Sequence, residues 1–265
     1  MQKTQQESRQ TSALAIILSA LANVLLGASS VYWRALNDVS SLTLVAYRVS
    51  LSTLILAFLI FTFRRYNQIE RYTLKLIRLH CIASLLIAIN WGVFIWSSIN
   101  GYILESGLGY LLAPIISVTL GTMIYRERVS TGKALFTFLV FGLVALLMVL
   151  IDNFNHGTSI LIALTWGLYT YLKKSTSLDA ANGLFIETLF LTSCLVPAIF
   201  LLDLPITQLS ELGTLSSNLI WLAGAISILP LLMFSYSTGK IPLSLTGFLQ
   251  FLLPLTLIAI ALVSP

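Results

Sequence analysis

Long apolar runs separated by short polar segments dominate this chain. A helix needs about 20 apolar residues to cross a bilayer, and nine segments approach or reach that length. They are Ser12–Trp33, Leu42–Phe63, Leu79–Asn100, Tyr102–Tyr125, Ala134–Ile151, His156–Leu172, Ala181–Leu202, Leu219–Ser237 and Ile241–Val263. Apolar runs of this length cross lipid as helices, which satisfy their own backbone polar groups. The pattern therefore predicts an all-α polytopic membrane protein with nine transmembrane helices after an N-terminal tail, residues 1–11.

The composition agrees with a membrane protein. Hydrophobic residues make up 57% of the 265 residues and charged residues 9%, whereas soluble domains carry about a quarter charged residues. With the N-terminus inside, 13 of the 15 basic residues fall in the inside loops. This is the bias that orients membrane proteins, so the net charge of +5 does not indicate a nucleic-acid partner. The same count places the C-terminus on the outer side.

An internal repeat is visible at a spacing of 140 residues. It aligns Phe94 with Phe234, Ser97 with Ser237, Gly107 with Gly247 and Pro114 with Pro254. The third and fourth segments then match the eighth and ninth, and a shift by five spans gives inverted repeats. We expect a first five-helix repeat over residues 12–151 and a second over residues 152–265. The counterpart of the charged cluster at Glu127 would fall beyond Pro265, so we expect four helices in the second repeat and no tenth helix.

Three ionisable residues lie inside the apolar runs, where insertion costs at least ~2.5 kcal/mol each. They are Arg48, Glu105 and Glu187. Arg48 either extends its side chain toward the interface or forms an ion pair with Glu105, and Glu105 is otherwise solvated at the interface. Glu187 has a short side chain, and we expect it to line a water-filled cavity. We also hypothesise that Glu187 couples transport to protons, which an unchanged pH dependence of uptake in Glu187→Gln would disprove.

Polar and aromatic residues also gather near the predicted midplane. This group contains Asn23, Asn90, Trp91, Tyr110, Trp166 and Gln250. The 140-residue shift aligns Tyr110 with Gln250, so both could face one central cavity. The alternative is interhelical hydrogen bonding at about 0.6 kcal/mol each. Trp33 and Trp221 are expected at the membrane interface.

A stripe of small residues along the fourth segment predicts close helix packing. It consists of Gly109, Ala113, Ser117 and Gly121. No phosphate-binding loop, HExxH or GxSxG motif is present, and the loops are too short for an active site. His80 and His156 are too few and too far apart for a metal site. We therefore predict no catalytic residue, no metal and no cofactor.

The stretch Asn90–Arg128 resembles the signature region of RarD-type permeases, in the EamA family of the drug/metabolite transporter (DMT) superfamily. The matching residues are Asn90, Trp91, Glu105, Leu108, Gly109, Tyr110, Pro114, Gly121, Glu127 and Arg128. Tyr47–Ser50, Gly183–Leu191 and Gly247–Pro254 are also similar to family segments. The resemblance implies ten helices in two inverted repeats, a central cavity, alternating access and a place in the bacterial inner membrane.

Together these observations predict a multi-pass permease for a small metabolite or drug-like solute. We expect the solute path to be lined by Arg48, Asn90, Trp91, Glu105, Tyr110, Glu187 and Gln250. The expected partners are a small-molecule substrate and the lipid bilayer, with a homodimer left open and no nucleic acid. The alternative is a truncated remnant or a membrane scaffold of the same family that does not transport.

Overall fold

The computed structural model describes residues 2–63 and 73–263, without the side chains of residues 2–11 and 261–262. Three of the basic residues predicted inside, Arg64, Arg65 and Arg71, lie outside the described residues. All regular structure in the described ranges is helical. The protein is thus an all-α polytopic membrane protein, as the sequence pattern predicts.

Each of the nine predicted segments contains a helix. The helices are α1 (Gln2–Arg34), α2 (Ser41–Thr62), α3 (Leu74–Ile99), α4 (Ile103–Met123), α5 (Thr131–Leu150), α6 (His156–Ser175), α7 (Ala180–Leu201), α8 (Thr214–Leu219), α9 (Ala223–Lys240), α10 (Leu243–Gln250) and α11 (Leu252–Val263). Two 3₁₀ turns, η2 (Leu209–Glu211) and η3 (Ile220–Leu222), complete the described structure. The pairs α8–α9 and α10–α11 each act as one span.

The predicted boundaries differ from the observed ones where caps and prolines act. Helix α3 begins at Leu74 rather than Leu79, because the Thr73 side chain accepts a hydrogen bond from the Leu76 N–H and caps the helix. The last span breaks at Phe251, between α10 and α11. Pro254 has no N–H to donate to the preceding turn, which explains a break at this point.

Eight of these spans are long and apolar enough to cross a membrane, and α6 is not among them. The reason is its buried polar face, which carries Thr158, Ser159, Thr165, Thr170 and Lys173. Helix α6 packs against α3, α4 and α9, so this face meets protein rather than lipid. Hydropathy alone therefore misses a helix whose polar residues are buried inside the bundle.

Contacts repeat at the spacing of 140 residues. A Cβ atom added at Gly27 of α1 would lie 2.7 Å from the Leu253 carbonyl oxygen of α11. A Cβ atom added at Gly167 of α6 would lie 3.3 Å from the Ala113 carbonyl oxygen of α4. Each residue of the second contact is 140 positions from its counterpart in the first. These matched approaches are what an internal repeat produces.

Helices α2 and α7 cross at equivalent positions. The hydroxyl oxygens of Thr53 and Thr192, 139 residues apart, lie 2.9 Å from each other. Helices α2 and α7 also begin and end 139 residues apart, one residue less than the repeat spacing, so in the expected repeat this contact lies near the axis that relates the two halves. Arg48 and Glu187, each five positions earlier, are also 139 residues apart. The same place in the two halves therefore carries opposite charges.

Contacts between loops separate the two ends of the bundle. At one end Lys174 Nζ donates to the Ile241 carbonyl oxygen at 2.7 Å, and the Tyr125 and Ser175 hydroxyls lie 2.9 Å apart. At the other end the Ser216 hydroxyl donates to Asp38 at 2.6 Å. The first end unites segments predicted inside, and the second unites segments predicted outside.

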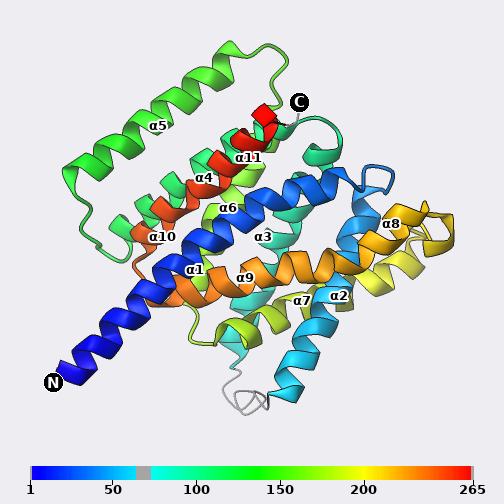
Figure 1. The fold of residues 1–265 in the computed structure, drawn as a ribbon, viewed down its shortest axis with the longest axis horizontal. Helices are drawn as coiled ribbons and strands as arrows, with labels where there is room; N and C mark the ends of the chain where they lie inside the picture. The colour runs from blue at the N-terminus through cyan, green and yellow to red at the C-terminus, as the bar shows by residue number, and fades with distance from the viewer. Residues whose placement is uncertain (1, 64–72, 264–265) are drawn as a thin grey trace.

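Helix α5 lies at one edge of the bundle, beside α4 (Figure 1). Only 6% of its most apolar 18-residue window is buried, and its surface is mostly apolar. Lipid is the natural environment of such a surface. The small-residue stripe of α4 instead faces protein, because Gly109 contacts Ser159 of α6 and Gly121 contacts Leu243 of α10. The packing role predicted for the stripe is confirmed.

Candidate functional site

A small, largely enclosed cavity lies among the helices of the bundle. Its volume of about 10 Å³ holds about one water molecule. Helices α1, α2, α3, α4, α6 and α11 contribute its lining of Leu26, Ser29, Arg48, Asn90, Trp91, Phe94, Tyr110, Trp166 and Leu253. Four of the seven predicted path residues therefore meet here, namely Arg48, Asn90, Trp91 and Tyr110. Trp166, expected near the midplane, joins them.

Asn90 and Tyr110 hold each other in one orientation. The Tyr110 hydroxyl donates to Asn90 Oδ1 at 2.8 Å, and Asn90 Nδ2 donates to the Thr165 hydroxyl at 3.0 Å. The Tyr110 ring also packs edge-on against Phe94 and Trp166. This network links α3, α4 and α6, and it gives the cavity a fixed wall of aromatic rings.

Arg48 is the charged group of the cavity. Its side chain is 3% exposed, and its guanidinium carbon lies 3.8 Å from the centre of the Trp91 ring and 5.0 Å from that of Trp33. Cation–π attraction of this kind stabilises a desolvated guanidinium. The Nε and Nη1 atoms have no hydrogen-bond partner. Arg48 is thus buried and stacked on two tryptophan rings, and two of its N–H donor atoms have no hydrogen-bond acceptor.

Two expectations about these residues are wrong. Trp33 is 1% exposed and contacts Arg48, so it is not an interface anchor. The ion pairs found among the described residues centre on Glu187, and Arg48 is not paired with Glu105. Glu105 lies in the first turn of α4, where its backbone carbonyl accepts a 2.7 Å hydrogen bond from Ser159.

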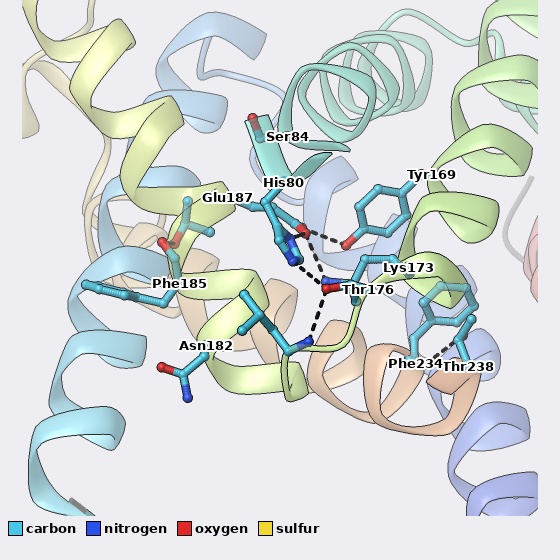
Figure 2. Close-up of polar contacts among 12 residues, drawn as sticks. His80, Ser84, Tyr169, Lys173, Thr176, Asn182, Phe185, Glu187, Phe234 and Thr238 are labelled. Atoms are coloured by element: carbon cyan, nitrogen blue, oxygen red, sulfur yellow. Dashed lines mark hydrogen bonds and ion pairs between the residues drawn. The ribbon is translucent and has the colours of Figure 1, made fainter. Parts of the chain in front are cut away.

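A second polar cluster surrounds Glu187 on α7 (Figure 2). Glu187 Oε1 lies 2.6 Å from His80 Nδ1 and accepts a hydrogen bond from Lys173 Nζ at 2.9 Å. Its other oxygen accepts one from the Tyr169 hydroxyl at 3.0 Å. The second ring nitrogen of His80 lies 2.8 Å from the Thr176 hydroxyl. Glu187 is therefore enclosed by partners and does not line the central cavity.

Sequence reasoning missed His80 and Lys173 as members of this cluster. The predicted sixth segment ends at Leu172 and leaves Lys173 outside the membrane, yet the Lys173 side chain is 2% exposed. A signal was present, because Tyr169 and Lys173 are four residues apart and so share one face of α6. A buried acid on a neighbouring span then needed a partner of opposite charge.

Aromatic rings separate the Glu187 cluster from the central cavity. Trp166, on the cavity wall, stacks on Tyr169 with ring centres 5.7 Å apart and lies 4.9 Å from Phe234. On its other side the cluster borders an open hollow of about 510 Å³. The lining of this hollow includes Thr176, Asp179, Ser235 and Lys240. The cluster and its rings therefore form a barrier between the hollow and the cavity.

Gln250 is buried, and its side chain forms hydrogen bonds to other helices instead of lining the cavity. Its amide nitrogen donates to the Thr170 hydroxyl at 2.6 Å, and its oxygen accepts from the Ser117 hydroxyl at 3.0 Å. It joins α10 to α4 and α6 beside the cavity and does not line it. For this residue the geometry matches the alternative of interhelical hydrogen bonding.

Glu127, in the loop after α4, caps α10. Its two carboxylate oxygens accept hydrogen bonds from the Leu243 and Ser244 N–H groups at 2.8 and 2.7 Å. Partial burial of the carboxyl opposes its ionisation, but these bonds and the nearby charge of Lys174 lower the pKa of Glu127. Glu127 thus ties the end of α4 to the start of α10 across the two halves.

Metal ligands do not gather in the described part of the chain, where no group of three His, Cys, Asp or Glu side chains could hold an ion. Cys81 and Cys194 are both free thiols.

Comparison with known proteins identifies relatives along most of the chain. An uncharacterized transporter of Vibrio cholerae is 32% identical and covers 93% of this chain and 82% of its own length. The uncharacterized transporter YojE of Bacillus subtilis is 30% identical and covers 93% and 84%. The protein RarD of Salmonella typhi is 29% identical and covers 93% of this chain and 84% of its own length.

Family models and solved structures complete the comparison. No family model matches the chain. One solved crystal structure, at 14% identity, superposes with a TM-score of 0.66 over 94% of this chain and 87% of that chain, which shows a shared fold. The relatives at 30% identity and above match nearly the whole chain, and others carry the name RarD. The chain belongs to the RarD-type transporters of the EamA family in the drug/metabolite transporter superfamily, and it is a membrane transporter of that family.

Proposed function

We propose that this protein moves a small organic solute across the bacterial inner membrane by alternating access. The observation that carries the proposal is the central cavity, which is small, largely enclosed and lined by residues from both halves of the chain. A cavity lined by aromatic rings and a few oriented polar groups is typical of small-molecule sites. In transporters with repeats, such sites lie near the midplane between the two halves.

The outer closure consists of contacts that join α1, α2 and the connection between them to α8 and the connection that precedes it. The Ser216 hydroxyl donates to Asp38, and the Thr207 N–H donates to the Thr43 hydroxyl at 3.0 Å. The Tyr32 hydroxyl donates to the Leu219 carbonyl oxygen at 2.9 Å. Each bond joins an element of the first half to one of the second. A rocking motion of the two halves would break these bonds together.

The inner closure is the Glu187 cluster with the rings of Tyr169, Trp166 and Phe234. It joins α3 of the first half to α6 and α7 of the second. The open hollow beyond it has room for a small solute at that end of the bundle. Basic residues gather at this end, which we assign to the cytoplasm by the positive-inside rule, with the N-terminus inside.

Thiol labelling tests this proposal. Ser29 lines the cavity and is 9% exposed, so Ser29→Cys in a background without Cys81 and Cys194 reports access to the cavity. A membrane-impermeant thiol reagent should label it from either side of sealed vesicles. Leu255→Cys, 56% exposed on the bundle surface, serves as the lipid-facing control and should resist labelling. Labelling of Ser29→Cys from only one side, or from neither, would refute alternating access.

A further inference from the structure

The central cavity presents hydrogen-bond donors that lack acceptors. The Nε and Nη1 atoms of Arg48 and the Nε1 atom of Trp166 are buried without a hydrogen-bond partner. Both residues line the cavity. The Nε1 atom of Trp33, whose ring contacts Arg48, is a further buried donor without a partner. On this lining, every buried polar atom without a partner is a donor.

The charge of the site is also one-sided. Arg48 is 3% exposed and forms none of the ion pairs found among the described residues. A buried charge without a partner is costly, and the rings of Trp33 and Trp91 offset only part of that cost. The other polar side chains on the wall already form hydrogen bonds, because Tyr110 donates to Asn90 and Ser29 donates to the Leu26 carbonyl oxygen. The wall therefore offers one positive charge, and its polar atoms without any partner are donors.

These features favour a ligand group that accepts hydrogen bonds and carries a single negative charge. A carboxylate fits this description, since it accepts charge-assisted hydrogen bonds from a guanidinium and has no donor of its own. A phosphate dianion fits less well, because the site supplies a single positive charge. The remaining wall, made of Leu26, Phe94, Trp91 and Leu253, suits an apolar or aromatic body.

We propose that Arg48 and Trp166 bind the carboxylate of a small organic monocarboxylic acid, whose apolar body packs against Phe94 and Trp91. This inference rests on the proposed transport function and names its substrate class. The small cavity admits about one water molecule, so the acid enters when the two halves separate on one side. The carboxylate then meets donors that the fold already holds in place.

Calorimetric titration of the purified full-length chain in detergent tests the proposal, with benzoate, phenylacetate and acetate as probes. Their neutral amides, such as benzamide, match them in shape and serve as ligand controls. We expect at least one acid to bind the wild type roughly 10-fold or more tightly than its amide, because hydrogen bonds to a charged group are strong. Absence of such a preference for every acid would overturn the proposal.

Variants then assign the binding to the site. Arg48→Gln should weaken acid binding by roughly 10- to 100-fold, whereas Arg78→Gln, the same change at an exposed arginine, should leave it unchanged. Trp166→Phe keeps a ring and removes only the N–H, so it should give a smaller loss and tests the site even where Arg48→Gln does not fold. Acid binding that both Arg48→Gln and Trp166→Phe retain in full would contradict the assignment.

An inorganic anion is the other source of the same chemistry. Chloride is titrated separately, and benzoate should displace it from the wild type. Chloride binding that no carboxylate displaces would overturn the proposal in favour of an inorganic ion. The titration measures binding and needs no transport. A negative titration would therefore overturn the substrate class without affecting the thiol-labelling test of alternating access, and a negative labelling result would not affect the titration.

Discussion

Lys173 and Glu187 form a buried ion pair at 2.9 Å that was not foreseen from the residues themselves. Removing one member of such a pair leaves an uncompensated charge and costs about 3–5 kcal/mol. We therefore predict that Lys173→Met lowers the free energy of unfolding by about that amount in a detergent-based unfolding titration. Lys75→Met, at an exposed lysine, is the matched control and should change it by less than about 0.5 kcal/mol. Equal effects of the two variants would argue against a buried pair.

Glu127 makes a pH-dependent contribution to stability. Its pKa is lowered in the folded protein, so its stabilising effect is present above the unfolded pKa of about 4.3 and is lost as the pH falls through the folded value. Glu127→Gln should cost about 1 kcal/mol of unfolding free energy at pH 7, as a weakened helix cap does, and the difference should shrink below about pH 4. Asp152→Asn, at an exposed acid, should show no such difference. A Glu127→Gln deficit that persists at low pH would disprove the charge-based cap.

At the level of single residues, the sequence indicated which residues gather at the cavity better than it indicated which residues they contact. Arg48, Asn90, Trp91 and Tyr110 stood out because polar groups are rare in apolar spans, and they do meet. The residues that Arg48 contacts could not be predicted from the sequence in the same way. Depth along a helix follows from residue count, but the side of the helix that faces a neighbour depends on how the helices pack. Trp33 was misplaced for that reason.

Among the helices, close backbone approach at glycine positions supports the packing of the two halves. A Cβ atom at Gly27 would lie 2.7 Å from a backbone oxygen of α11, which cannot move without shifting that helix. Gly27→Ala should therefore lower the unfolding free energy by about 1–3 kcal/mol. Gly142→Ala, in α5, meets nothing within 4 Å and should be neutral or stabilising, since alanine favours helix. A Gly27→Ala variant as stable as Gly142→Ala would contradict this packing.

The helices themselves were largely predictable, since length and apolarity mark eight of the nine spans. Helix α6 was the least apparent, because its polar residues are buried against other helices and lower its hydropathy. The breaks at η3 and at Phe251 were not predicted. Pro254 was noticed as a repeat marker, yet the position of a break depends on which backbone bonds neighbouring helices can replace.

On the scale of the whole molecule, the expected repeat would give the proposed path two different closures. Helices α2 and α7 meet at Thr53 and Thr192, with Arg48 in one half at the place that Glu187 occupies in the other. Five residues of helix correspond to about 7.5 Å, so in inverted halves the two charges lie on opposite sides of that crossing. The outer closure therefore lies beside Arg48, which has free hydrogen-bond donors. The inner closure contains Glu187, whose carboxylate is already bonded to its neighbours.

Distances across the two ends of the bundle test the central claim most directly. Spin labels at Lys75 of the first half and Gly239 of the second report on the inner end, and labels at Asn37 and Leu215 report on the outer closure; all four residues are exposed. Pulsed electron paramagnetic resonance in lipid nanodiscs, with Cys81 and Cys194 replaced, should show that conditions lengthening the inner distance shorten the outer one. A single unchanging distance at both pairs, or a simultaneous increase at both, would contradict alternating access through this cavity.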